Sequence, residues 1–234
     1  MSDRRWHPSV GVVMPVRNGG DTIGAAIHGV LAQVLPVSEV VVVDGNSHDA
    51  TLGRKPVNRR VKVVFQRGTG LGAARNQGIA ALRTELVGFC DADDQWTPHS
   101  LAVRLDYLFG HAATAAVVGG VVIHATNGQQ VPNHRAPILG EAVAGYTPGA
   151  FLGWAPTIQP FDETLRIAAD TLWFVRMRES SFALDAIDQV VLHKGVGART
   201  LSNDLVTYQR EMSKIIKELA ATRRRWPNPE QEKN

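Results

Sequence analysis

Three carboxylates directly follow a short apolar stretch of the sequence. Residues 86–90 form an apolar run typical of a buried strand, and Asp91, Asp93 and Asp94 fill three of the next four positions. Asp91 and Asp93 are separated only by Ala92, where a strand gives way to a loop. Carboxylate oxygens suit Mg²⁺ and Mn²⁺, which keep other positions open for water and phosphate. The pattern therefore predicts a divalent-metal site on Asp91 and Asp93.

A simpler interpretation is a polar turn that caps the next helix. That helix would begin near Pro98, with Asp94 or Thr97 as its cap. A cap explains one carboxylate, but it does not explain three behind a hydrophobic strand. The metal site is the preferred interpretation.

The composition describes an ordinary globular protein. The chain has 234 residues, of which 44% are hydrophobic and 20% charged, enough for one large domain or two small ones. The net charge of +3 mildly favours anionic ligands, but basic and aromatic residues do not alternate as in a nucleic-acid surface. Cys90 is the only cysteine, which excludes a disulfide framework and predicts a small core residue.

The polar N-terminal residues and the hydropathy of the chain point to a cytoplasmic location. Residues 1–8 are polar and lack the apolar segment of a signal peptide. No apolar run is long enough for a transmembrane segment. We therefore expect a soluble cytoplasmic protein, and the sequence assigns no oligomeric state.

The elements that would position the carboxylates alternate between strand and helix. Valine-rich runs predict strands at 10–14, 40–43, 61–65, 86–90, 115–124 and 190–193, and apolar spacing predicts helices at 23–34, 73–82, 101–109 and 169–178. A last helix would be capped by Ser202 and carry Arg223, Arg224 and Arg225 in its final turn. Strands without polar alternation predict a single α/β domain, its mostly parallel central sheet covered by helices on both faces. Ligands of such sheets bind beyond the carboxyl ends of the strands.

The stretch from Thr126 to Pro160 has weak periodicity and many glycines and prolines. Such a long irregular stretch is either a functional loop or partly disordered. We expect it to form a mobile wall of the site.

The order of motifs resembles the family 2 glycosyltransferases, nucleotide-sugar-dependent enzymes with the Rossmann-like GT-A fold. The resemblance runs from about Val10 to about Ser202. The segments that carry it are 13–18, 42–51, 70–78, the Asp91-Ala92-Asp93 motif, and 161–163 followed by Asp170 and Trp173.

The resemblance implies a reaction and a set of site residues. A sugar would pass with inversion from a nucleoside-diphosphate donor, with a UDP-sugar favoured, to an acceptor hydroxyl that the sequence does not identify. Asp170 would be the general base, and Mn²⁺ or Mg²⁺ would bind Asp91 and Asp93 with His193 as a third ligand. The donor would contact Pro15, Val16, Arg17, Asp44, Gly72, Arg75, Asp91, Ala92 and Asp93.

The resemblance also implies a domain organisation. Residues 1–8 would be a tail, and 9–201 the GT-A domain, with 9–125 holding the nucleotide sugar and 126–201 the acceptor. Residues 202–226 would form the C-terminal helix, and 227–234 would be disordered. The chain lacks the long C-terminal extension and membrane helices of polysaccharide synthases, so polymerisation with extrusion is not expected.

Two departures from the family pattern concern the donor and the base. Many members carry a second aspartate where this chain has Gly45, and that aspartate often contacts the uracil ring. The family commonly places glutamate before its catalytic aspartate, whereas Ala169 precedes Asp170 here. The base itself is kept.

Each candidate also has a structural interpretation. Asp44 would anchor a turn, Arg75 would be a solvated helix residue, Asp170 would cap its helix, and His193 would be an ordinary strand histidine. Lys194 and Arg199 would form either a lid over the diphosphate or an exposed basic loop. Trp173 is expected in the core, and Trp154 either stacks on an acceptor or packs in the core.

Two other functions fit the same residues. A nucleotidyltransferase acting on a sugar phosphate would also use a carboxylate-bound metal, but it would release pyrophosphate. A catalytically silent nucleotide-sugar-binding module would bind the donor without turning it over.

Overall fold

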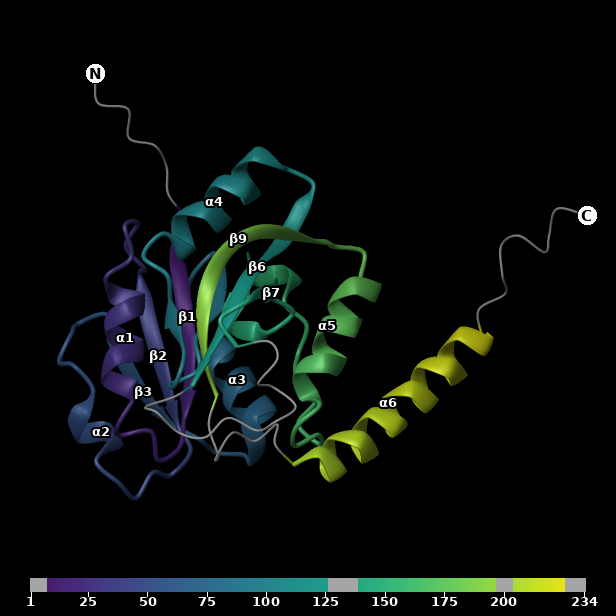
Figure 1. Cartoon of the computed structure of the whole chain (residues 1–234), viewed down its shortest axis with the longest axis horizontal. Coiled ribbons are helices and arrows are strands. Elements are labelled where there is room, and N and C mark those ends of the chain that lie inside the picture. Colours follow the sequence, from purple (N-terminus) through teal and green to yellow (C-terminus); the bar gives the residue numbers. More distant parts are fainter. Residues whose placement is uncertain (1–7, 126–138, 197–203, 226–234) are drawn as a thin grey trace, which may run out of the picture.

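The computed structural model describes residues 8–125, 139–196 and 204–225. One nine-stranded sheet runs through it in the order β3-β2-β1-β4-β8-β6-β9-β5, with β7 paired to β6 (Figure 1). The strands are β1 (Val10–Val16), β2 (Glu39–Asp44), β3 (Val61–Phe65), β4 (Leu86–Phe89), β5 (Gln95–Trp96), β6 (Thr114–Ala125), β7 (Ala142–Ala144), β8 (Phe151–Trp154) and β9 (Ala183–Val196). The helices are α1 (Ile23–Leu31), α2 (Thr51–Arg54), α3 (Gly70–Ala81), α4 (Ser100–Gly110), α5 (Ala169–Glu179) and α6 (Leu205–Arg225), with 3₁₀ turns at Pro148–Ala150 and Ala155–Thr157.

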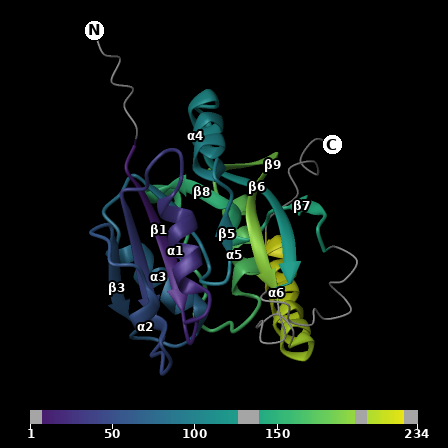
Figure 2. The ribbon, with the colours of Figure 1, turned by 60° about the vertical axis from the view of Figure 1, so that its left-hand side comes forward.

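The predicted parallel sheet with helices on both faces is confirmed. Strands β3, β2, β1 and β4 are parallel, so the carboxyl ends of β1, β2 and β4 meet at one edge. Val12 and Met14 pack with α1 and α4, whereas Val13 packs with α3 and α5 on the other face. Figure 2 shows α1 and α3 on opposite sides of β1. Burial on both faces explains why these strands are uninterrupted valine runs.

The stretch expected to be a mobile loop contributes a central strand, so that expectation is wrong for its described part. Strand β8 lies between β4 and β6 and is antiparallel to both. A side chain at Gly153 would lie 2.6 Å from the Phe151 ring and 2.8 Å from Ala116 on β6, so only glycine fits there. Trp154 is half-buried against the core. Residues 126–138 lie outside the described part of the chain.

Strand β9 is longer than the predicted strand at 190–193. It begins at Ala183 and runs parallel to β6, with shifts in register around Gly120. The polar residues Asp185, Asp188 and Gln189 hide its first half from a search for apolar runs. Its second half pairs with the two-residue strand β5, which places His193 opposite Gln95. This pairing brings the end of β9 to the loop that carries the three carboxylates.

The helix caps differ from the predicted ones. Neither Asp94 nor Thr97 caps α4, which begins at Ser100 without a side-chain cap. Asp170 makes no capping bond to α5. The predicted cap Ser202 lies outside the described ranges. Trp173 and Cys90 are fully buried, as predicted.

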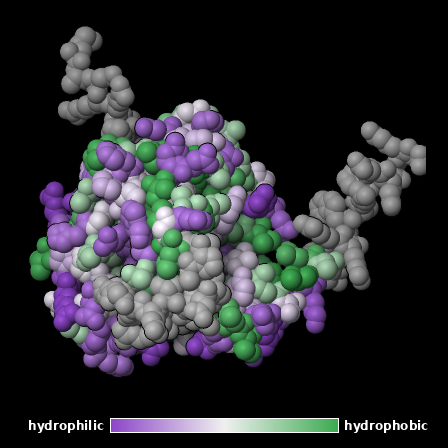
Figure 3. Space-filling model, in the orientation of Figure 1, coloured by the Kyte–Doolittle hydropathy of each residue, from purple (hydrophilic) through white to green (hydrophobic). Residues whose placement is uncertain are grey.

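Helix α6 packs against the start of α5 and then extends away from the sheet (Figure 1). Its buried Ile215 contacts a small cluster with Leu165, Ala169 and Leu172. Leu205, Val206 and Ile216 are exposed on it, and Figure 3 shows apolar residues along the side where α5 and α6 lie. None of the helices in the described ranges is long and apolar enough to cross a bilayer.

Glu211 of α6 holds the backbone that leads into α5. Its carboxylate accepts hydrogen bonds from the N–H groups of Arg166, Ile167 and Ala168 at 2.8–2.9 Å, and the residue is only 5% exposed. Burial by itself would raise the pKa of Glu211, but the three backbone donors outweigh it and hold the pKa below its ordinary value. Glu211 thus supplies the acceptor that no residue of α5 provides at its own start.

We expect Glu211→Ala to lower the free energy of unfolding by about 2 kcal/mol, because bonds to a charged acceptor are lost and buried donors stay unpaired. Urea denaturation measures the change. Gln209→Ala, an exposed change on the same helix, is the control and should alter stability little. Equal stability of both variants would contradict the role of Glu211.

Candidate functional site

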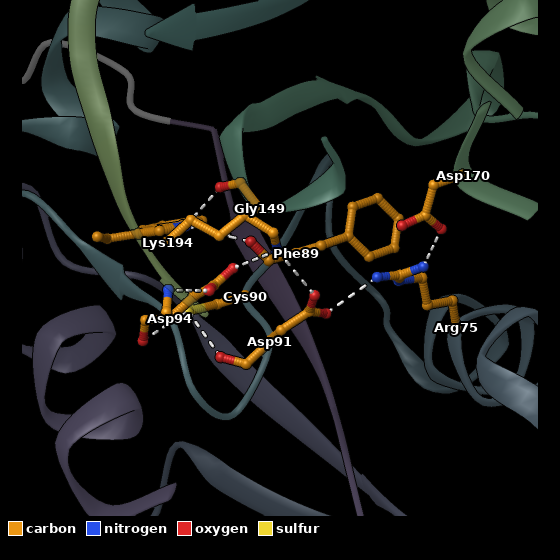
Figure 4. Close-up of polar contacts among 10 residues, drawn as sticks. Arg75, Phe89, Cys90, Asp91, Asp94, Gly149, Asp170 and Lys194 are labelled. Carbon is orange, nitrogen blue, oxygen red and sulfur yellow. Dashed lines mark hydrogen bonds and ion pairs between the residues drawn. The ribbon is translucent and has the colours of Figure 1, made fainter. Parts of the chain in front are cut away.

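The loop between β4 and β5 places its carboxylates at the edge where the parallel strands end. Cys90 still pairs with β1 through its N–H and the Val13 carbonyl at 3.1 Å, and the turn closes with Asp94 N–H donating to the Asp91 carbonyl at 3.0 Å. The indole N–H of Trp96 fixes the loop by donating to the carbonyls of Phe89 and Gly149. Figure 4 shows Asp91 pointing toward Arg75 and Asp94 toward Lys194. The loop thus presents its carboxylates in two directions.

Arg75 joins two of the predicted site residues. Its Nη2 donates to Oδ1 of Asp91 at 3.0 Å, and its Nη1 donates to Oδ1 of Asp170 (Figure 4). The arginine side chain is fully buried, with its guanidinium 5.2 Å from the centre of the Phe161 ring. Burial by itself would lower the pKa of Arg75, but Asp170 and Asp91 outweigh it, so the pKa is raised. The side chain therefore lies between the two aspartates and is neither solvated nor extended along the glycine-rich loop.

A close backbone contact sets this position of Arg75. A side chain at Gly72 would come within 2.7 Å of the Asp162 carbonyl oxygen, so glycine lets the start of α3 lie directly against the segment that precedes α5. Asn76 adds two bonds to the same segment, from its amide to the Phe161 carbonyl and from the Phe161 N–H to its oxygen. Helices α3 and α5 are thereby fixed to each other, and Arg75 reaches Asp170 without crossing solvent.

Asp170 faces Asp91 across Arg75, which pairs with both carboxylates. Its side chain is 30% exposed, whereas that of Arg75 is fully covered. Burial raises the pKa of Asp170 and Arg75 offsets only part of that effect, so the pKa lies above its ordinary value. A carboxylate that is more basic than usual and still reachable from solvent can accept a proton.

Lys194 is a site residue that the sequence did not place among the ligands of the metal or the donor. It lies in β9, where its Nζ is 3.2 Å from Oδ2 of Asp94 and 3.6 Å from Oδ2 of Asp91. Asp94 is fully buried and also accepts the N–H of Gly195 at 3.0 Å. Burial raises the pKa of Asp94 to about 7 despite the neighbouring Lys194. The sequence suggested Lys194 only as part of a basic loop, either a lid over the diphosphate or exposed, and not as a partner of Asp91 and Asp94, whereas the structure places it in β9. Arg199 lies outside the described ranges.

His193 points to a different partner from the two aspartates. Its Nδ1 lies 2.7 Å from Nε2 of His124, and both rings line a surface pocket of about 430 Å³ together with Asp93 and Lys194. Burial and His124 lower the pKa of His193. In the described part of the chain no three His, Cys, Asp or Glu side chains are grouped so that they could hold a metal. The structure therefore does not bring Asp91, Asp93 and His193 together as one ligand group.

The ends of β1 and β2 form the predicted donor side of the edge. Pro15 and Val16 are buried, whereas Arg17 is exposed. The carbonyl of Val16 accepts a hydrogen bond from the Gly45 N–H at 2.8 Å, which joins the ends of β1 and β2. Asp44 is 1% exposed: its Oδ2 accepts the Ser47 N–H at 3.1 Å, and its Oδ1 is buried without a hydrogen-bond partner in the described structure. One oxygen thus anchors the turn, and the other is unused. A buried acceptor without a partner is costly, which makes it a place for a ligand donor.

Solved structures with this fold bind nucleotide sugars. The mannosyltransferase PcManGT from Pyrobaculum calidifontis, in complex with GDP-Man and Mn²⁺, has a TM-score of 0.67 at 19% identity over 93% of this chain and 65% of that one. Staphylococcus aureus TarS 1-349 in complex with UDP-GlcNAc has a TM-score of 0.65 at 18% identity over 84% of this chain and 61% of that one. The curled, mostly parallel sheet with surrounding helices is the GT-A fold of glycosyltransferases.

A family model described as glycosyl transferase family 2 matches residues 11–176. The chain belongs to this family, which confirms the resemblance and contradicts the nucleotidyltransferase alternative. Among curated relatives, the succinoglycan biosynthesis protein ExoO of Rhizobium meliloti is 37% identical over 113 residues, covering 47% of this chain and 32% of the relative. The chain matches less than half of the length of three curated relatives, which include ExoO.

Proposed function

We propose that the chain transfers a sugar, with inversion, from a nucleoside diphosphate to an acceptor hydroxyl, with Asp170 as the general base. The observation that carries the proposal is the Asp91–Arg75–Asp170 bridge at the carboxyl edge of a GT-A sheet. It fixes a basic carboxylate at a set place relative to the loop expected to hold the diphosphate. A helix cap or a surface ion pair would require neither the burial of Arg75 nor this placement.

In the proposed reaction Asp170 takes the proton of the acceptor hydroxyl. The acceptor oxygen attacks the anomeric carbon from the side opposite the diphosphate and forms the new glycosidic bond. The bond from that carbon to the diphosphate oxygen breaks, and its electron pair leaves with the nucleoside diphosphate. Arg75 keeps Asp170 aimed at the acceptor and compensates part of the charge of both aspartates. The unused Oδ1 of Asp44 would accept a hydrogen bond from the ribose or base of the donor.

The residues present fit a divalent metal. Four carboxylates, Asp91, Asp93, Asp94 and Asp170, face two cations, Arg75 and Lys194, so the ionised cluster carries two uncompensated negative charges. Asp93 forms no ion pair with any described residue and is exposed. Asp91 and Asp93 would hold Mn²⁺ or Mg²⁺, and the metal would supply positive charge for the departing diphosphate. His193 would need to turn away from His124 to join them.

A binding screen tests the proposal. We expect UDP-sugars to raise the melting temperature in the presence of Mn²⁺, because a ligand at 100 times its Kd stabilises the folded state by about 2.7 kcal/mol. GDP-sugars belong in the screen, since Gly45 offers no side chain to a uracil ring. Transfer to simple sugar acceptors or hydrolysis of the bound donor then separates an enzyme from a silent binding module. No stabilisation by any nucleotide sugar, with or without metal, would contradict the proposed function.

A further inference from the structure

Lys194 lies on the side of Asp91 that faces away from Arg75. Its Nζ is 3.6 Å from Oδ2 of Asp91 and 3.2 Å from Oδ2 of Asp94, and its side chain is 21% exposed (Figure 4). The antiparallel pairing of β9 with β5 sets this position, because it lays the end of β9 along the loop of carboxylates. The ammonium is thus part of the site, whereas the family model ends at residue 176 and does not include β9.

The two oxygens of Asp91 are not equally available to a metal. Oδ1 accepts the hydrogen bond of Arg75, which is fully buried and held between two aspartates. A metal bound by Asp91 would therefore use Oδ2, the oxygen that Lys194 contacts. An ammonium and a divalent cation cannot share that place, because two positive charges a few ångströms apart repel strongly.

The contact at Oδ2 can open more easily than the contact at Oδ1. The 3.6 Å separation between Lys194 and Asp91 is longer than a hydrogen bond, and the side chain of Lys194 reaches solvent. The ammonium ends a flexible four-carbon chain, so it can turn while its backbone stays in β9. Asp94 keeps the Gly195 N–H when the ammonium moves. The loop therefore stays attached to β9.

We propose that Lys194 occupies the metal position beside Asp91 until a metal–nucleoside diphosphate complex displaces it, after which its ammonium pairs with the diphosphate. This inference rests on the proposed function and adds an order of binding to it. A metal ion that arrives alone must displace the Lys194 ammonium from Asp91 without offering it a new anionic partner, so the metal ion binds weakly. Metal that arrives with a diphosphate supplies a new anionic partner for Lys194. Metal and nucleotide should accordingly strengthen each other's binding.

Metal binding in the absence of nucleotide gives the direct test. We expect Lys194→Met to bind Mn²⁺ alone roughly tenfold more tightly than the wild type, because the competing charge is gone. The same variant should bind UDP more weakly in saturating Mn²⁺, since the ammonium no longer reaches the diphosphate. Paramagnetic resonance of free Mn²⁺ measures the first effect, and calorimetry measures the second. Lys194→Arg keeps the charge and should resemble the wild type in Mn²⁺ binding.

A matched control and a double variant show whether a change in Mn²⁺ binding comes from the loss of the Lys194 charge. Lys62→Met removes another lysine that pairs with a carboxylate, Glu39 at 2.6 Å, on β3 and away from the site, and should leave Mn²⁺ binding unchanged. Since Lys194→Met leaves the buried Asp94 without its cation, Lys194→Met/Asp94→Asn removes both charges and should still bind Mn²⁺ more tightly than Asp94→Asn alone. Equal or weaker Mn²⁺ binding on loss of Lys194 would overturn the inference, whatever UDP does. If neither the wild type nor any variant binds UDP or GDP, that result would instead count against the proposed function.

Discussion

Asp170→Asn is expected to lower sugar transfer by roughly 10²-fold or more while donor affinity stays near that of the wild type. Asparagine keeps the shape of the side chain and can still accept a hydrogen bond from Arg75, but it cannot take the acceptor proton. The loss should therefore appear in kcat and not in the Kd for the donor. Turnover at saturating donor and acceptor, together with calorimetric donor titration, separates the two quantities.

The control for Asp170 is a buried carboxylate paired with a cation elsewhere. Glu39 is 8% exposed, bonds Lys62, and accepts the Arg83 N–H at 3.0 Å, far from the carboxyl edge. Glu39→Gln should match Asp170→Asn in losing the charge of a paired carboxylate but keep full transfer. If Asp170→Asn also transferred sugar at a near-normal rate, Asp170 would be only the partner that neutralises Arg75.

Asp93→Asn should weaken Mn²⁺-dependent UDP binding by roughly 10²-fold. Loss of a group that only hydrogen-bonds a metal ligand already lowers metal affinity about 10- to 100-fold, and Asp93 is proposed to be a ligand itself. Arg75 and Lys194 already contact Asp91, whereas Asp93 forms no ion pair in the described ranges. The charge lost in Asp93→Asn is therefore one that would otherwise stabilise the bound metal. Titration with UDP at fixed Mn²⁺ measures the effect.

Asp106 on α4 is the matched control for Asp93. It is also exposed, but it lies within α4 and not on the loop that carries the carboxylates, so Asp106→Asn should leave binding unchanged. Binding of UDP in chelator should differ little between Asp93→Asn and the wild type, because no metal is present to be lost. An unchanged Mn²⁺-dependent affinity would remove Asp93 from the metal site.

The sequence predicted the parts of the fold whose conformation is locally determined. Runs such as Val40 to Val43 are apolar on both faces and end at turn residues, so they are strands in any context that buries them. Strand β8 could not be predicted in the same way. It is four residues long, contains Gly153 and is closely flanked by Pro148 and Pro156. Its extended conformation depends on pairing with β4 and β6, which lie far from it in sequence.

The site residues likewise differ in whether local sequence could predict them. Asp91 and Asp93 have a local signature, an apolar strand that ends in carboxylates. Asp170 was predicted only through the family resemblance, because its partner Arg75 lies 95 positions away. Lys194 and Asp94 are 100 positions apart, and Glu211 lies beyond the segment that the family model covers. Electrostatic pairs between distant segments leave no periodicity, so only the folded chain places them together.

The place of β8 in the sheet also constrains how the protein can be made on the ribosome. When residues 86–89 leave the exit tunnel, β4 can pair with β1, but its other edge stays open until residues 151–154 are synthesised. An unpaired edge of apolar residues invites association with other chains. The nascent polypeptide therefore presents an unfinished sheet from the synthesis of β4 until that of β8. Chaperone binding to stalled chains should fall sharply once β8 has emerged.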